Sequence, residues 1–121
     1  MKRVRREHVI FEMNQENEPV LTAVSGETVV FETQDCVSGE VQSEADTVSD
    51  IDFSKVNPAT GPLFVSGAEV RDILKVTINR IEIDNKGAVL TAPGLGLLSD
   101  GIGAEETAIA EVTDSATLYK G

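Results

Sequence analysis

The sequence predicts an all-β fold: an antiparallel β-sandwich of the jelly-roll type, with long irregular loops and little helix. Short stretches rich in β-branched residues recur along the 121 residues. Turn signals separate these stretches about every dozen positions, a spacing typical of sandwiches. No stretch is a convincing long helix, and the length suits one compact domain. We therefore expect a single β-sandwich domain over residues 1–121.

Most of the expected strands lie on either side of a long acidic loop. β-Branched and aromatic residues favour a pleated, half-buried surface, and they predict strands at 5–13, 20–24, 28–31 and 63–65. Residues 37–55 hold five acidic residues and only scattered apolar ones, which predicts a loop with a short helical turn around 43–51. A loop of this length in a compact domain is either functional or a mobile acidic surface.

The clearest strand signal covers residues 72–83. Leu74, Val76 and Ile78 fall on one face of this stretch, whereas Ile81 and Ile83 fall on the other. Such a change of face is expected where a long strand bends or crosses between sheets. A turn at 84–87 and a returning strand at 88–92 complete an expected hairpin, and further strands are expected at 107–112 and, more weakly, at 116–119.

Composition excludes several functional classes. The net charge is −11, which argues against a nucleic-acid or anionic-membrane partner because both attract basic surfaces. No apolar run approaches the roughly 20 residues needed to cross a bilayer. The basic residues at 2–6 are expected to open an edge strand that pairs with the acidic body. With one cysteine and no visible export signal, the expected compartment is the cytoplasm.

Two polar stretches are candidates for a site. Glu32 to Cys36 place carboxylates, an amide, a hydroxyl and a thiol directly after a strand, although such a run is also a common solvated strand end. Residues 57–62, Asn-Pro-Ala-Thr-Gly-Pro, form a stiff turn that could hold substrate through Asn57, Thr60 and Gly61, or could simply stop a strand.

Three blocks in order resemble the acetamidase/formamidase family. They are Phe-Glu-Thr-Gln-Asp-Cys at 31–36, Asn-Pro-Ala-Thr-Gly-Pro at 57–62 and Val-Ser-Gly-Ala-Glu at 65–69. The resemblance runs from about residue 8 to residue 98 and covers the first part of the family enzyme. Val-Arg-Asp at 70–72 replaces the usual Pro-Gly-Asp turn, and the Gly-Asn-Met-Asp segment of the family's long second half is absent. The chain thus looks like half an enzyme.

The resemblance implies a jelly-roll-like sandwich that hydrolyses small linear amides such as formamide and acetamide to a carboxylate and ammonia. Asp35 is the first catalytic candidate, as a general base that orients water or as a ligand for a divalent cation, and Glu32 is the second. A divalent metal ion would need ligands that this chain lacks. Cys36 has no base partner nearby, so we expect a small buried residue there.

A non-catalytic binding or assembly module derived from the family is the alternative. In either case an isolated half should leave apolar surface open, so we expect a homo-oligomer or a second-half polypeptide as partner. The glycine-rich segment 93–103, which lacks the pattern of a phosphate-binding loop, and the C-terminal strand are expected near that interface.

Overall fold

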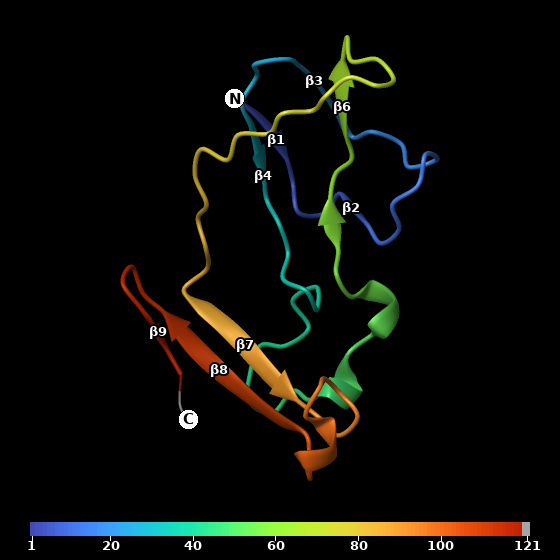
Figure 1. The fold of residues 1–121 in the computed structure, drawn as a ribbon. Helices are drawn as coiled ribbons and strands as arrows, with labels where there is room; N and C mark the ends of the chain where they lie inside the picture. Colours follow the sequence, from blue (N-terminus) through green and yellow to red (C-terminus); the bar gives the residue numbers. More distant parts are fainter. Residues whose placement is uncertain (120–121) are drawn as a thin grey trace. The chain divides into compact units, whose positions relative to one another are not determined.

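The structure, a computed structural model, describes residues 1–119, and its all-β class confirms the prediction. Helical structure in the described chain is confined to three short 3-10 turns (Figure 1), η1 Val48–Asp50, η2 Phe53–Lys55 and η3 Ser99–Gly101. The first of these lies within the helical turn expected around 43–51. In the part that the structure describes, we find no helix with the length and apolarity that a membrane span requires.

The chain divides into two compact units, each built from two stretches of sequence. The first unit comprises Met1–Ser38 and Asp52–Thr77, and the second comprises Gly39–Ile51 and the chain from Ile78 onward. The acidic loop predicted at 37–55 is therefore shared between the units.

The first unit contains three pairs of strands. These are β1 (Lys2–Val4) with β4 (Val29–Phe31), β2 (Val9–Ile10) with β5 (Ala59–Thr60), and β3 (Leu21–Val24) with β6 (Leu63–Ser66). The β2–β5 pair is antiparallel, but β1–β4 and β3–β6 are parallel, an orientation that the antiparallel expectation did not include. Parallel neighbours need long connections, and the partners here are distant in the sequence, with Lys2 opposite Val29 and Leu21 opposite Leu63.

The single strand predicted at 5–13 is wrong, because a turn interrupts it. The backbone N–H of His8 donates to the carbonyl of Arg5 at 3.1 Å, which separates β1 from β2. The basic residues of β1 nevertheless pair with acidic ones as expected: the Lys2 ammonium lies 2.7 Å from the Glu27 carboxylate.

The second unit is built on an antiparallel sheet in the order β7–β8–β9, formed by Lys86–Thr91, Glu106–Val112 and Thr117–Leu118. The acidic loop is held to this sheet, because the Thr107 hydroxyl donates to the Asp46 carbonyl at 2.5 Å and Lys86 donates to Gln42 at 3.1 Å. The Ser49 hydroxyl of η1 adds a third contact, because it donates to the Glu105 carboxylate, directly before β8, at 2.7 Å.

The strand predicted at 72–83 is wrong for this chain by itself. Residues 74–84 have no secondary structure, and every residue from 70 to 83 is exposed. β7 therefore pairs with β8 and not with the preceding segment. Strand propensity describes fitness for a pleated, half-buried surface, and no other part of the described chain supplies that surface here.

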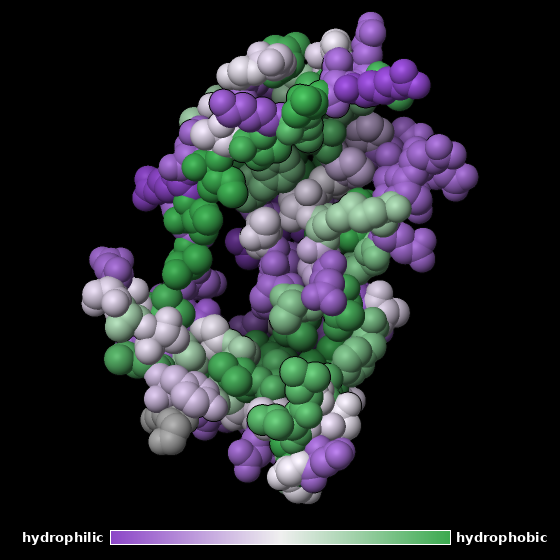
Figure 2. All heavy atoms as spheres, viewed as in Figure 1, coloured by the Kyte–Doolittle hydropathy of each residue, from purple (hydrophilic) through white to green (hydrophobic). Residues whose placement is uncertain are grey.

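The core of each unit is small. Among the described residues, the buried hydrophobic side chains are Val4 and Ala23 in the first unit and Val41, Ala92 and Ala110 in the second. Figure 2 shows correspondingly extensive apolar surface, including along the stretch that Figure 1 draws between β6 and β7.

Candidate functional site

The two candidate stretches lie side by side in the first unit. The Thr60 hydroxyl donates to the Glu32 carbonyl at 3.0 Å, and the Asn57 N–H donates to the Cys36 carbonyl at 2.7 Å. A third bond, 2.6 Å from the Ser38 hydroxyl to the Lys55 carbonyl, closes the far end. Residues 32–38 and 55–60, which we call the site block, are thus joined along their length.

β4 and the turn after it position the carboxylates of the block. The backbone N–H of Glu32 donates to the Val4 carbonyl at 3.0 Å and extends the contact between β1 and β4. The Asp35 carboxylate accepts the Val37 N–H at 2.8 Å, and the Asp35 carbonyl accepts the Ser38 N–H at 3.1 Å. Asp35 therefore shapes the turn through both its side chain and its backbone, as Asp commonly does.

Glu32 is held by the basic start of the chain. Its carboxylate lies 2.6 Å from the Arg3 guanidinium, with the Glu32 side chain 29% exposed. The hydrogen bond from Arg3, and further the backbone N–H of Arg6, keep the pKa of Glu32 below its ordinary value of 4.5. Glu32 is therefore a charged, anchored group at neutral pH.

The second stretch holds its backbone in conformations that few residues adopt. Asn57 is exposed and has a φ of 55°, in the left-handed region that asparagine tolerates better than most side chains. Gly61 is buried with a φ of 142°, which favours glycine, and its N–H donates to the His8 carbonyl at 2.9 Å. These φ values describe the shape of the turn, and its stiffness stays a prediction.

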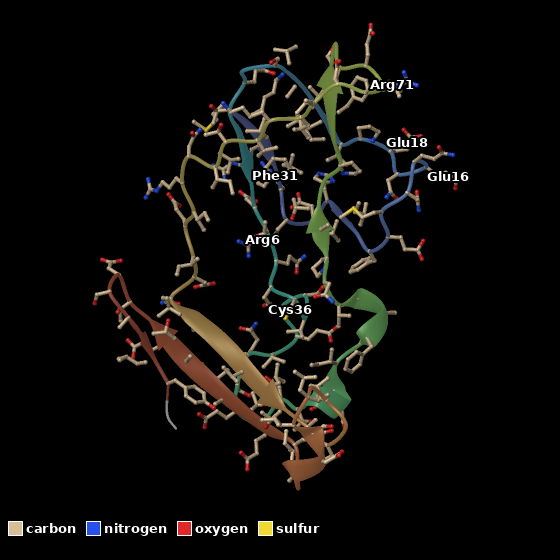
Figure 3. All side chains as sticks on the ribbon, in the orientation of Figure 1. Arg6, Glu16, Glu18, Phe31, Cys36 and Arg71 are labelled. Carbon is tan, nitrogen blue, oxygen red and sulfur yellow. The ribbon has the colours of Figure 1, made fainter. Side chains whose placement is uncertain are left out.

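Cys36 corrects the sequence-based expectation, because its side chain is exposed and not buried. Figure 3 shows Cys36 on the loop that follows β4, beyond Phe31. The Cys36 backbone is nevertheless bonded, because its carbonyl accepts the Asn57 N–H.

The structure brings the predicted residues Glu32, Asp35, Asn57 and Thr60 into the site block, and Gly61 follows directly after it and bonds to His8. The sequence-based prediction included Gln34 in the first stretch but did not place Arg3 beside it. Gln34 donates to the Arg6 carbonyl at 3.1 Å, so β1 and the loop after it contact the first stretch of the site block. The concentration of basic residues in an otherwise acidic chain was the signal that could have indicated this role.

A divalent cation does not fit the described residues alone. Among residues 1–119, no group of three or more His, Cys, Asp and Glu side chains is arranged to hold a metal ion. The Asp35 carboxylate already accepts a backbone N–H, and Glu32 is paired with Arg3.

Comparison with known proteins identifies the family. The family model described as the Acetamidase/Formamidase family matches residues 7–117. The chain belongs to the acetamidase/formamidase family. No curated protein matches it significantly.

Solved structures of similar proteins agree with this assignment. The chain is 39% identical to an acetamidase from Bacillus halodurans, with a TM-score of 0.94 over 98% of this chain. It is 35% identical to a predicted acetamidase/formamidase from Thermoanaerobacter tengcongensis, with a TM-score of 0.88 over 98% of this chain. An acetamidase from Yersinia enterocolitica, at 20% identity and a TM-score of 0.65 over 98% of this chain and 42% of its own, shares the fold.

The chain spans only part of these relatives. It covers 40% of the Bacillus halodurans chain and 42% of the Thermoanaerobacter tengcongensis chain. The chain of this acetamidase/formamidase family member thus spans less than half the length of these two relatives.

Proposed function

We propose that this chain supplies the first part of an amidase that hydrolyses small linear amides, such as formamide and acetamide, to a carboxylate and ammonia. The remaining catalytic groups would come from the part of the family fold that this chain does not span. Membership of the acetamidase/formamidase family over residues 7–117 is the observation that carries the proposal.

The site block supports a division of roles between its two carboxylates. Glu32 is fixed by Arg3 and by the N–H of Arg6, so it serves better to position the block than to exchange protons. Asp35 is exposed at the turn, and one of its oxygens is oriented by the Val37 N–H. A carboxylate held in this way can accept a proton from the water that attacks the amide carbon.

The second stretch is suited to hold the substrate. Its exposed Asn57 amide can both donate to a carbonyl oxygen and accept from an amide N–H. The Thr60 hydroxyl is already bonded to the Glu32 carbonyl, so in this proposal it contributes chiefly by keeping the two stretches together. The leaving ammonia needs a proton donor, and the stabilisation of the oxyanion needs donors, that the block does not itself provide.

The test is ammonia release from formamide and acetamide, with and without a separately expressed polypeptide covering the rest of the family fold. We expect no release by the chain alone and release by the mixture. Asp35→Asn should then lower the rate by about tenfold or more, the scale expected for loss of a general base. Asn can still accept the Val37 N–H, so the turn is preserved and the loss reports chemistry.

Asp114→Asn, an exposed carboxylate in the second unit, is the matched control and should leave the rate unchanged. If Asp35→Asn matches the parent in an active mixture, the assignment of Asp35 as the base is wrong. If the mixture forms a complex that never releases ammonia, the chain is a non-catalytic binding or assembly module, the alternative that its small core and exposed apolar surface also favour.

A further inference from the structure

We propose that residues 73–83 are an incomplete β-strand, completed by pairing with a strand from the part of the acetamidase/formamidase fold that this chain does not span. The inference rests on the second-half polypeptide of the proposed function, and it adds where that polypeptide binds. It does not depend on the chemistry assigned to the site block.

The first observation is the exposure of large apolar side chains in this segment. Ile73 is 95% exposed, and the others lie between 72% and 74%. The exposed apolar residues of the segment are Ile73, Leu74, Val76, Ile78, Ile81 and Ile83. Monomeric proteins rarely leave contiguous apolar surface of this kind open unless it binds a partner.

The second observation is the unpaired backbone. Within residues 1–119, none of the main-chain N–H and C=O groups of 73–83 makes a hydrogen bond to another part of the chain. An extended segment with free main-chain groups is a template for strand addition. Its β-branched content is the composition that paired strands favour.

The third observation is the total accessible surface, which is 9702 Å² for a chain of 12.9 kDa. A compact folded monomer of that mass exposes about 6,300 Å², and two independent domains of half the mass would expose about 7,600 Å² in total. The excess is on the order of the area that obligate interfaces bury. The chain thus carries a surface that a folded partner normally covers.

The order of apolar side chains predicts that the partner covers different faces of the segment in its first and second parts. Leu74, Val76 and Ile78 share one face, with polar residues between them on the other, and Ile81 and Ile83 then occupy the opposite face. The change of face falls near residue 79, close to the point where the two compact units divide between Thr77 and Ile78. The completing strand and the side chains around it should therefore cover one face of 74–78 and the other face of 81–83.

A second copy of this chain is a poorer occupant than the remainder of the fold. The net charge is −11, so bringing two copies together places like charges side by side. The Bacillus halodurans acetamidase contains about 60% of its length beyond the region matched here, since this chain covers 40% of it. That remainder is long enough to contain both the completing strand and the apolar surface that would cover this segment.

The experiment co-expresses the chain with a tagged polypeptide covering the unmatched portion of the Bacillus halodurans acetamidase, and measures co-purification and amide hydrogen exchange. The matched portion of that acetamidase is the positive control for the probe. In the chain alone, the amides of 73–83 should exchange as in an unfolded peptide. In the complex, they should exchange at least a hundredfold more slowly.

Two neighbouring substitutions in the chain test the faces. Val76→Asp places a charge on the apolar face and should reduce co-purification at least tenfold, whereas Thr77→Asp places the same charge on the polar face and should retain it. Amides of 73–83 that stay unprotected in a complex, or equal loss for both variants, would overturn the proposal. The proposal would also be overturned if the tagged polypeptide bound the matched portion of the Bacillus halodurans acetamidase but not this chain. Protection of 73–83 without the tagged polypeptide would overturn it too, because a second copy would then be the occupant.

These readouts are separate from ammonia release. A protected segment in a complex without amidase activity upholds this interface and removes the proposed function. An active mixture in which the amides of 73–83 stay unprotected upholds the proposed function and removes this interface.

Discussion

Two stretches of this chain were predicted as strands from similar composition, β8 and the segment 73–83. Only β8 forms a paired strand in the structure. β8 pairs with β7 on one side and β9 on the other, and buries Ala110 to 3% exposure. The segment carries larger apolar residues, yet Val76 within it is 73% exposed and its backbone is unpaired in the described chain. Its strand signal is at least as strong as that of β8.

The difference between the two stretches is the presence of a partner. β7 lies 15 to 25 residues away from β8 along its paired register, so a hairpin-like connection brings the two together. Among residues 1–119, no strand of either unit pairs with 73–83. Local composition makes a stretch fit for a sheet, but the free energy of pairing comes only when another strand is present.

The largest expected effect contrasts the two stretches directly. Ala110→Asp introduces an unpaired charge into the buried face of β8, and it should lower the free energy of unfolding by about 2–4 kcal/mol. Val76→Asp in the isolated chain should change it by less than about 0.5 kcal/mol, because the side chain is already in water. Urea unfolding followed by far-UV circular dichroism measures both. A large loss for Val76→Asp alone would show that 73–83 is already packed in the isolated chain.

A smaller effect on the free energy of unfolding is expected when the site block is compared with the segment 73–83. Thr60→Val keeps the shape of the side chain but removes the hydroxyl that donates to the Glu32 carbonyl, and it should destabilise the chain by about 1 kcal/mol. Thr77→Val, the same change in the unpaired segment, should be close to neutral. Equal effects in the same urea experiment would mean that the Thr60 hydrogen bond does not hold the site block together.

The smallest expected effect concerns charge in the same two regions. The Lys55 ammonium, 2.8 Å from the Asp52 carboxylate, together with hydrogen bonds from Ser54 lowers the pKa of Asp52 from 3.8 to about 2. The folded-state pKa is thus below the unfolded value, so the contribution of Asp52 to stability is present above pH 3.8 and is lost as the pH falls toward 2.

Lys55→Met should raise the pKa of Asp52 toward 3.8, since it removes the largest cause of the shift. Lys75→Met in the segment should leave that pKa where it is. Carboxyl titration by nuclear magnetic resonance checks both, and an unchanged Asp52 in the Lys55 variant would show that the Ser54 hydrogen bonds suffice.

The sequence by itself determined which stretches have the chemistry of strands and turns. β-Branched residues marked β4, β6 and β8 closely, and the polar run after Phe31 marked the turn that Asp35 forms. The three blocks at 31–36, 57–62 and 65–69 indicated the family that the comparison then showed. These features are local, because propensity, capping and turn geometry act over a few neighbouring residues.

Only the tertiary structure decided which strands pair, in which direction, and which side chains are covered. Leu21 pairs with Leu63, and Thr60 binds Glu32, across separations of dozens of residues. The parallel direction of β1–β4 and β3–β6 is a property of such distant contacts. The exposure of Cys36 and the unpaired state of 73–83 show where the described chain provides no covering surface. A local pattern carries no information about the partner that will cover it, so these properties depend on which surfaces the rest of the fold brings close.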